Sequence, residues 1–323
     1  MSPPSAMRAA ILLGPRRLQV STVPLPQPGA GQVRVRIEGC GVCGSNLGPW
    51  RGVPGVSYPL PPGSPGHEAW GRIDAVGTGV DRERVGEAVA LVSGAAFAEY
   101  DVADAAQAIA VPPELFDGPL PGEALGCIVN IFRRAAVRRA MTVAIVGIGF
   151  IGAGLTRLCA RAGARVIAVS RRSFALQLAR RLGAEQALPS DRLDDVATAI
   201  AALTDGRGCD AVIEAVGTQD ALDLAARLPR TRGVLVVAGY HQDGPRVVNM
   251  QEWNWRGIDV INAHERYPEV IAAGVRSAVE LVRHGIIDPN ELCTHTFALE
   301  QLGDALGALE MRPDGFLKAV IRP

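Results

Sequence analysis

A glycine-rich turn between an apolar strand and an amphipathic helix constrains the fold of this chain more than any other segment. Residues Thr142–Gly147 form a continuous apolar run, and Phe150–Ala162 spaces its apolar residues as a helix does. The turn reads GIGFIG, a G-x-G-x-x-G placed where a strand ends and a helix begins. A helix N-terminus offers free N–H groups and a positive dipole end, so we predict that this turn holds the pyrophosphate of a dinucleotide rather than being a turn without a ligand. The predicted cofactor-binding residues of the turn are Gly147, Gly149, Phe150, Ile151 and Gly152.

The same alternation of strand and helix continues beyond the turn. Further apolar strands are predicted at Arg165–Ser170, Asp210–Val216 and Val234–Ala238, with helical stretches at Phe174–Leu182 and Asp220–Leu228. Buried strands that alternate with helices favour a parallel, doubly wound sheet. Ligands bind at the carboxyl ends of the strands in such sheets, which adds four residues to the predicted cofactor site. These residues are Val216, Gly217, Gly239 and Tyr240.

The end of the second strand indicates which dinucleotide is bound. Proteins that bind NAD place an acidic residue there to hold the ribose 2′-hydroxyl. This strand ends in Ser170 and is followed by Arg171 and Arg172, with no carboxylate. A hydroxyl and two guanidiniums suit a 2′-phosphate, so we predict NADP(H). The competing interpretation is a solvated helix start, because 32 of the 33 basic residues of the chain are arginine.

The first third of the chain has a different pattern. Residues Gln32–Ile37 alternate apolar and charged side chains, as a half-buried strand does. Short strands with glycine punctuation are predicted at Ala69–Val76, Ala88–Val92 and Phe97–Val102, and the proline-rich segment Val53–Gly66 is predicted to be a loop. This pattern is typical of a small antiparallel barrel.

Composition excludes several classes of protein. The chain has 323 residues with 33 basic and 33 acidic side chains, so there is no net field to attract nucleic acid or an anionic membrane. Six cysteines are too few for a disulfide scaffold of this length. No apolar run reaches the roughly 20 residues of a membrane span, and the start of the sequence lacks a basic region before an apolar stretch. We therefore expect a soluble, cytoplasmic protein with a small-molecule substrate.

Two motifs carry residues that suit a metal. Cys43 lies in GVCGSN and His67 lies 24 residues later in GHE. Thiolate and imidazole are preferred ligands of Zn²⁺, and a catalytic zinc needs a third protein ligand. Glu123 is a candidate for the third ligand, and Cys127 is its competitor. Taken singly, Cys43 and His67 fit better as a buried thiol and a satisfied histidine, and only the two motifs together favour a zinc site. The pair Cys40-x-x-Cys43 is a weak signal by itself, and Cys40 is expected in the core.

These segments together resemble the zinc-dependent medium-chain dehydrogenases/reductases of the alcohol and polyol dehydrogenase type. The resemblance rests on MRAAILLGPRRLQVSTVPLPQPGAGQVRVRIEGCGVCGSN, PGHEAWGRIDAVGTGV, GIGFIG and FLKAVIRP, and it covers essentially the whole chain. It implies an α/β fold, with a GroES-like β-barrel catalytic domain over residues 1–118 and 263–323 and a Rossmann NADP-binding domain over residues 119–262. It places Cys43, His67 and Glu123 as metal ligands, and Glu68 beside them as an outer group or alternate ligand.

The resemblance also implies a mechanism. A single catalytic zinc acts as a Lewis acid on the substrate oxygen while a hydride passes between the substrate and the nicotinamide. Ser45 matches the hydroxyl that passes the substrate proton toward solvent. Lys318 matches a basic residue near the cofactor pyrophosphate, or is an exposed lysine at the end of the chain. The residues predicted to line a substrate pocket are Trp50 and Asn130, with Tyr100 and Trp253 as weaker candidates.

The sequence departs from the family pattern at four places. Asn46 replaces an aspartate, and Gly48 replaces a histidine that serves as a proton relay in some members. Ala124 replaces a proline after Glu123. The lobe that holds a structural zinc with four cysteines is absent, and the sequence between Val89 and Tyr100 has no cysteine. We therefore expect one catalytic zinc and no structural zinc.

Other functions stay open at this stage. A zinc-free NADPH-dependent enone or quinone reductase of the same superfamily would not need Cys43 and His67 together. A biosynthetic reductase of an unusual carbonyl or imine is compatible with Asn46 and Gly48. A non-catalytic nucleotide-binding protein is disfavoured by the intact set of Cys43, Ser45, His67 and Glu68. By analogy with the fold, we expect a homodimer.

Overall fold

In the computed structural model, which describes residues 5–190 and 192–323, the chain divides into two compact units. Unit 1 comprises Met1–Gly126 and Arg266–Pro323, and unit 2 comprises Cys127–Glu265. The boundaries lie eight and three residues beyond those predicted at 118 and 262. The first difference arises because helix α2 (Gly122–Ala135) begins inside unit 1. A Cβ at Gly122 would lie 2.5 Å from that of Ala90, so this turn of the helix packs on the barrel strands.

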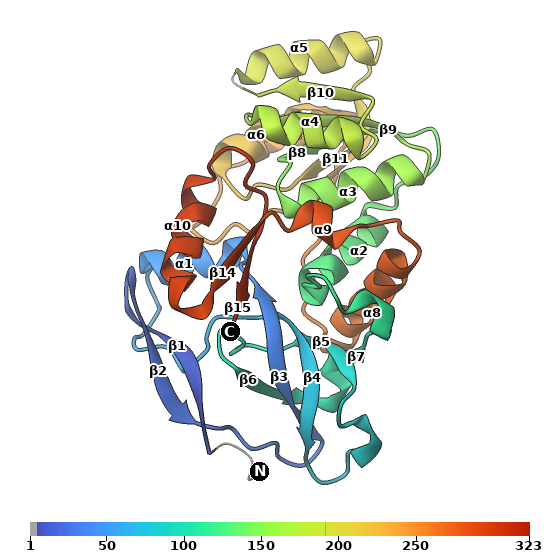
Figure 1. The fold of residues 1–323 in the computed structure, drawn as a ribbon. Coiled ribbons are helices and arrows are strands. Elements are labelled where there is room, and N and C mark those ends of the chain that lie inside the picture. The colour runs from blue at the N-terminus through green and yellow to red at the C-terminus, as the bar shows by residue number, and fades with distance from the viewer. Residues whose placement is uncertain (1–4, 191) are drawn as a thin grey trace. The chain divides into compact units, whose positions relative to one another are not determined.

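Unit 1 is built on a seven-stranded sheet with the order β14-β15-β3-β4-β5-β7, in which β6 also pairs with β3 (Figure 1). Most neighbours are antiparallel, as the alternating pattern predicts, while β14 and β15 are parallel. A two-stranded antiparallel sheet, β1-β2, touches the loop before β6 through a bridge between Ala9 and Ala98. The strands are β1 (Ala6–Gly14), β2 (Arg17–Pro24), β3 (Gln32–Gly41), β4 (Glu68–Val76), β5 (Ala88–Val92), β6 (Tyr100–Asp104), β7 (Ala108–Ala110), β14 (His295–Ala298) and β15 (Ala319–Arg322).

The core of unit 1 lies between these strands and the helices of the same unit. Its largest fully buried side chains include Trp70, Phe97 and Phe316, and Cys40 belongs to the same core, as expected. A Cβ at Gly39 would lie 2.1 Å from the Trp70 ring, so the glycine is needed for this packing. The helices of unit 1, besides the start of α2, are α1 (Leu47–Arg51), α8 (Pro268–Arg283), α9 (Pro289–Leu292) and α10 (Leu302–Met311).

Unit 2 is a six-stranded parallel sheet with the order β10-β9-β8-β11-β12-β13. The continuous apolar strands predicted from the sequence form its centre, where they are buried on both faces. The strands are β8 (Thr142–Val146), β9 (Arg165–Ser170), β10 (Gln186–Pro189), β11 (Cys209–Glu214), β12 (Pro229–Val237) and β13 (Asp259–Asn262). The helices are α3 (Phe150–Arg161), α4 (Ser173–Arg181), α5 (Leu193–Leu203), α6 (Gln219–Arg227) and α7 (Met250–Arg256).

The strand order of unit 2 reverses direction at β8. The chain first runs outward from β8 through β9 to β10, and α3 and α4 pack on these strands. It then crosses back to β11, so α5 and α6 belong to the opposite face because such crossovers are right-handed. The carboxyl ends of β8 and β11 flank the point of reversal, where open α/β sheets bind ligands. The doubly wound α/β fold is therefore confirmed.

A helix needs about 20 mostly apolar residues to span a bilayer. The longest, α8, has 16 residues. None of the helices formed by residues 5–190 and 192–323 combines the length and the apolarity needed to cross a membrane.

Candidate active site

Three side chains that can bind a metal converge at one end of strands β3 and β4. Cys43 follows β3, His67 directly precedes β4, and Glu68 is the first residue of β4. The two strands are antiparallel with Gly41 opposite Glu68, which brings the end of one to the start of the other. One ligand atom each from Cys43, His67 and Glu68 lies within 4.8 Å of the other two.

The imidazole of His67 is oriented by the backbone beside it. Its Nδ1 lies 2.8 Å from the carbonyl oxygen of Pro65, so Nδ1 carries the proton and donates it there. The other nitrogen, Nε2, is therefore the one that can bind a metal, once it has lost its proton. The hydroxyl Oγ of Ser45 lies 3.5 Å from the same Nε2, so the structure brings Ser45 together with the metal-binding side chains.

Asn46 connects the two loops that carry Cys43 and His67. Its Oδ1 accepts the backbone N–H of Cys43 at 2.7 Å, and its Nδ2 donates to the carbonyl oxygen of Pro65 at 2.9 Å. The side chain is buried, with 2% of the residue exposed. An aspartate, the family residue at this position, has no N–H to offer to Pro65. The departure therefore has a structural role that its sequence position does not show.

Glu68 forms a buried ion pair with Lys318, the only lysine of the chain. Lys318 Nζ lies 2.5 Å from Glu68 Oε2 and 3.3 Å from the carbonyl oxygen of Val42. The side chains are 5% and 1% exposed, so the interpretation of Lys318 as an exposed terminal lysine is wrong. A Cβ at Gly41 would lie 2.0 Å from Glu68 Oε2, so a glycine is needed there to admit the carboxylate.

Charges around the cluster favour a bound cation. Burial lowers the pKa of His67, but the Cys43 sulfur and the carboxylates of Glu123 and Glu68 outweigh it and raise that pKa to about 10. Burial likewise lowers the pKa of Lys318, while Glu68 and Cys43 raise it, and the net shift is upward. Cys43 and Glu68 contribute to both upward pKa shifts, so potentially anionic groups face this point of unit 1. The donor set fits Zn²⁺ in type and in charge.

The third predicted ligand, Glu123, lies in the first turn of α2 and is half-buried. Its charge acts on His67, but the compact group of three contains Glu68 instead. Cys127, the competitor, lies one helical turn after Glu123, in the segment assigned to unit 2. Ala124, which replaces a proline, is buried in the same turn.

A short loop occupies the position of the missing zinc lobe. Residues 93–99 connect β5 to β6, and the buried carboxylate of Asp101 accepts the N–H groups of Ala95 and Val102 at 3.0 and 2.8 Å. The loop in turn bonds the segment before His67, because the N–H groups of Ala96 and Phe97 donate to Gly66 and Gly63. The Asp101 carboxylate thus ties the loop, through Ala95, to strand β6.

The glycine-rich turn of unit 2 has the geometry that its sequence predicts. Gly147 has φ of 97°, and a Cβ there would lie 2.4 Å from Val216 Cγ2. A Cβ at Gly152 would lie 1.9 Å from the carbonyl oxygen of Gly147, so helix and strand pack closely only with glycine. A Cβ at Gly149 would meet nothing within 4 Å. Phe150 and Ile151 then begin α3, leaving an open cradle at the helix N-terminus.

The residues predicted to bind a 2′-phosphate lie beside this turn. Ser170 is the last residue of β9, and its Oγ accepts the N–H of Arg172 at 3.3 Å. The guanidinium of Arg172 donates to the carbonyl oxygen of Ile148 at 3.2 Å, so it reaches across to the glycine-rich turn. Arg171 is exposed. The three residues thus surround the end of β9 next to β8.

The four predicted residues at the ends of later strands also lie together, on the other side of β8. A Cβ at Gly217 would lie 2.6 Å from the carbonyl oxygen of Tyr240, and one at Gly239 would lie 2.3 Å from the N of Gly217. Between these loops lies Glu214, a fully buried carboxylate that the sequence interpretation missed. The available signal was an acidic residue at the end of the apolar run AVIE.

The residues predicted to line a substrate pocket lie in or against the packed parts of the two units, and their role stays a prediction. Trp50 is 7% exposed and belongs to the core of unit 1. Asn130 is buried on α2. Tyr100 packs against a small cluster that includes residues of β1, with Arg34 over its ring. Trp253 packs against the core of unit 2.

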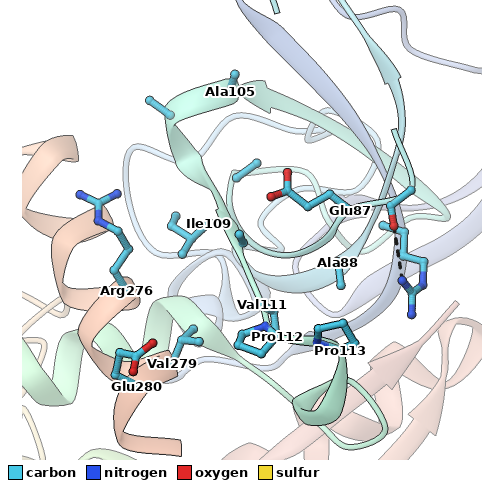
Figure 2. Close-up of a pocket in the computed structure, with 15 residues that line it drawn as sticks. Glu87, Ala88, Ala105, Ile109, Val111, Pro112, Pro113, Arg276, Val279 and Glu280 are labelled. Carbon is cyan, nitrogen blue, oxygen red and sulfur yellow. Dashed lines mark hydrogen bonds between the residues drawn. The ribbon is translucent and has the colours of Figure 1, made fainter. Parts of the chain in front are cut away.

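A groove of about 900 Å³ lies elsewhere on unit 1. Figure 2 shows its lining, in which Ile109 and Val111 form an apolar floor and Arg276 and Glu280 project from α8. None of the metal-cluster residues is among the described residues that line it. The groove is therefore separate from the chemistry of the candidate site.

Comparison with known proteins identifies the family. Residues 29–113 match the alcohol dehydrogenase GroES-like domain, and residues 151–276 match the zinc-binding dehydrogenase domain. Sorbitol dehydrogenase of Bacillus subtilis strain 168 is 26% identical over 352 residues, which cover 99% of this chain and 98% of that protein. The chain belongs to the medium-chain dehydrogenases/reductases, a group of oxidoreductases, as the resemblance in sequence predicts.

Two solved structures illustrate the similarity in fold. One is a short chain alcohol dehydrogenase from Escherichia coli CFT073 complexed with NADH, with a TM-score of 0.87, 25% identity, and coverage of 99% of this chain and 100% of that one. The other is a protein from Sinorhizobium meliloti 1021 bound to NADP, with a TM-score of 0.85, 26% identity, and coverage of 99% and 100%.

Proposed function

We propose that this protein is a zinc-dependent oxidoreductase that transfers a hydride between NADP(H) and a small alcohol or carbonyl substrate. The observation that carries this proposal is the convergence of Cys43, His67 and Glu68 within 4.8 Å, with the hydroxyl of Ser45 beside them. A zinc-free reductase would have no use for a thiol, an imidazole and a buried carboxylate at one point.

Cys43 and His67 would hold the metal, together with one carboxylate. Glu68 already has one oxygen bonded to Lys318, whereas Glu123 approaches from a different element, so we assign Glu123 as the third ligand. Glu68 would then act as an outer carboxylate. When bound, zinc supplies Lewis-acid polarisation of the substrate oxygen.

Ser45 would pass the substrate proton, because its hydroxyl faces the ligand nitrogen of His67. Gly48 has no side chain to continue the path, and it lies buried in α1. The relay beyond Ser45 must therefore use water or a hydroxyl of the cofactor. Asn46 would keep the two ligand loops in register during this transfer.

The preference for NADP(H) is supported by the residues at the end of β9. Ser170 and Arg172 lie next to the glycine-rich turn, Arg171 is exposed beside them, and Ser170 stands where an NAD-binding protein has a carboxylate. Similar structures bind either NADH or NADP, so the choice rests on these residues. A contact between Lys318 and the cofactor pyrophosphate stays a prediction, since the ammonium is buried against Glu68.

We also propose that the protein is a homodimer. Strand β13 ends the sheet of unit 2, pairs with β12, and has mostly exposed residues. Trp255 is 89% exposed on the adjoining helix α7, and Val260 is 42% exposed on the strand itself. An apolar strand edge with such neighbours favours pairing with another chain.

Metal analysis with cofactor titration tests the proposal. The purified protein is expected to contain about one zinc per chain. NADPH is expected to bind more tightly than NADH, and Arg171→Ala with Arg172→Ala should remove the difference. Purified protein that is active without any metal would contradict the zinc assignment and favour the enone or quinone reductase.

The same measurement decides the third ligand. We expect purified Glu123→Gln to contain less zinc than purified Glu68→Gln, because the Glu68 carboxylate already forms an ion pair with Lys318. The opposite order would assign Glu68 as the ligand.

A further inference from the structure

Three side chains in unit 2 form a chain of hydrogen bonds that the proposed mechanism does not use. Glu214 at the end of β11 accepts from Nε2 of His241 at 3.0 Å, and Nδ1 of His241 accepts from Nε of Arg246 at 2.8 Å. The three side chains are 0%, 14% and 15% exposed. Arg246 also pairs with Asp243 in the same loop.

Glu214 and Arg246, the two ends of this chain, also hold backbone of the predicted cofactor site. Glu214 Oε1 accepts the N–H groups of Val216 and Gly217 at 2.6 and 2.7 Å. Nη2 of Arg246 donates to the carbonyl oxygen of Gly217 at 3.0 Å. Glu214 and Arg246 therefore both bond the loop after β11. His241, in the loop after β12, bonds both of these side chains and so connects the two loops.

The two loops lie in contact, so a shift of one moves the other. The N–H of Gly239 donates to the backbone carbonyl of Glu214 at 2.8 Å, and a Cβ at Gly239 would lie 2.5 Å from Glu214 Oε2. Val216 in turn touches the glycine-rich turn, because a Cβ at Gly147 would lie 2.4 Å from its Cγ2. Nε2 of His264 lies 3.1 Å from the carbonyl oxygen of Gly239 and supports the same loop.

The position of these loops in the sheet determines which half of the cofactor they meet. The glycine-rich turn after β8 would hold the pyrophosphate, and Ser170 with Arg172, after β9, would hold the adenosine side. Strands β11 and β12 lie on the opposite side of β8. Their loops would therefore receive the nicotinamide side.

The hydrogen-bond donors fix the protonation of His241. A guanidinium N–H is only a donor, so Nδ1 of His241 must accept and Nε2 must carry the ring proton. The ring is thus neutral, with one donor and one acceptor in use. A side chain that replaces it must offer a donor to Glu214 and an acceptor to Arg246 about as far apart.

From these contacts we propose that Glu214, His241 and Arg246 are positioning residues that preform the nicotinamide half of the cofactor site. This inference rests on the proposed binding of NADP(H). None of the three needs to touch the reacting atoms, because their effect passes through the backbone of Val216, Gly217 and Gly239. Loosening them should weaken binding of the nicotinamide half and leave the adenosine half intact.

The test compares two ligands on His241→Leu and His241→Gln. NADPH occupies both halves of the site, whereas 2′,5′-ADP occupies the adenosine half. We expect His241→Leu to weaken NADPH about tenfold, since it leaves a buried carboxylate oxygen and an arginine N–H unsatisfied, while 2′,5′-ADP changes less than about twofold. Glutamine offers an amide donor and acceptor, so His241→Gln should keep NADPH within about threefold of the unmodified protein.

Control variants keep the result decisive. Asp210→Asn changes a carboxylate at the start of the same strand, β11, and should alter neither affinity. If His241→Leu fails to fold, Arg246→Gln tests the same hydrogen-bond chain at its more exposed end. We expect Arg246→Gln to weaken the binding of NADPH and to leave that of 2′,5′-ADP unchanged. Equal weakening of both ligands in His241→Leu, or no weakening of either, would overturn the inference. If the unmodified protein binds neither ligand, the proposed function fails and the inference falls with it.

Discussion

Two buried carboxylates organise the two units in different ways. Glu68 in unit 1 is stabilised by a cation, because the ammonium of Lys318 lies 2.5 Å from it. Glu214 in unit 2 has no cation bonded to it among the described residues, and it is stabilised by two backbone N–H groups and a neutral imidazole.

The difference matches the role that we propose for each region. A carboxylate beside a metal site must keep its negative charge balanced when the ion is absent and when it is bound, and a nearby ammonium does this. A carboxylate under a nucleotide loop has to fix backbone geometry, and directed N–H donors do this. The predictions below test this contrast from the largest expected effect to the smallest.

The largest effect is expected from the proposed metal ligands. Cys43→Ala and His67→Ala should each remove nearly all turnover and reduce zinc from about one per chain to a small fraction, because two remaining ligands hold zinc poorly. NADPH affinity, measured by fluorescence titration, should stay near that of the unmodified protein because its predicted site lies in unit 2. Full activity in either variant would contradict the zinc mechanism.

A large loss of stability is expected when the ion pair is broken from one side. Glu68→Gln leaves the Lys318 ammonium buried without a counterion, which should cost about 3–5 kcal/mol in the free energy of unfolding. Adding Lys318→Met should recover much of that loss, since no unpaired charge remains. Urea denaturation of the single and double variants measures both values. A double variant as unstable as the single one would show that the charge is not the cause.

A smaller loss of stability is expected at Glu214. Glu214→Gln leaves no buried charge behind, and its amide oxygen can still accept from the backbone N–H groups. We expect a cost of about 1–3 kcal/mol, mainly from the bond to His241. The same urea measurement checks it. If Glu214→Gln lost as much unfolding free energy as Glu68→Gln, the two carboxylates would not differ in the way that we expect.

Asn46 is expected to affect metal affinity more than stability. Asn46→Ala removes both bonds that join the ligand loops, which should weaken zinc binding about tenfold. Competition with a chromogenic chelator measures the affinity. Asn46→Asp keeps the acceptor for Cys43 but not the donor to Pro65. Its loss of zinc affinity should therefore be smaller than that of Asn46→Ala. Unchanged affinity in both variants would leave Asn46 as a packing residue.

The smallest effect is a pH dependence at Asp210, at the other end of β11 from Glu214. Burial raises the pKa of Asp210. Its hydrogen bonds to Arg230 and to the N–H of Thr142 lower that pKa by more, so the net shift is downward. A carboxyl with a lowered pKa in the folded state stabilises the fold above its ordinary pKa, and this contribution is lost as the pH falls through the lowered value.

Asp210→Asn should therefore be less stable than the unmodified protein at pH 7, by less than about 1 kcal/mol because the pair is partly exposed. The difference should shrink as the pH falls below about 4. Thermal unfolding of both proteins between pH 7 and pH 3 provides the measurement. A difference that grows in acid would reverse the sign of the pKa shift.

The sequence predicted the sheet of unit 2 and the positions of its glycines because both depend on local patterns. Apolar runs of strand length and the spacing GIGFIG determine a strand, a turn and a helix within 20 residues. The antiparallel barrel followed from similar local patterns, and the segments carrying Cys43 and His67 stood out through their motifs.

The partners of these residues were not predictable in the same way. Lys318 reaches Glu68 across 250 residues of sequence, through the pairing of β15 with β3 and of β3 with β4. His241 and Arg246 lie in a loop with no strand or helix pattern, where no periodicity indicates which side chain turns inward. Contacts of this kind depend on tertiary packing. The only sign of them in the sequence is Glu214, an acidic residue at the end of an apolar run.

The single lysine has a practical consequence for chemistry in solution. Reagents that acylate lysine amines have one possible lysine target in this chain, and its nitrogen is enclosed beside Glu68. Slow labelling of that amine would then report the intact site, and faster labelling would mark its opening before the rest of the chain unfolds. The protein thus carries one reporter group, at the point where its proposed metal chemistry takes place.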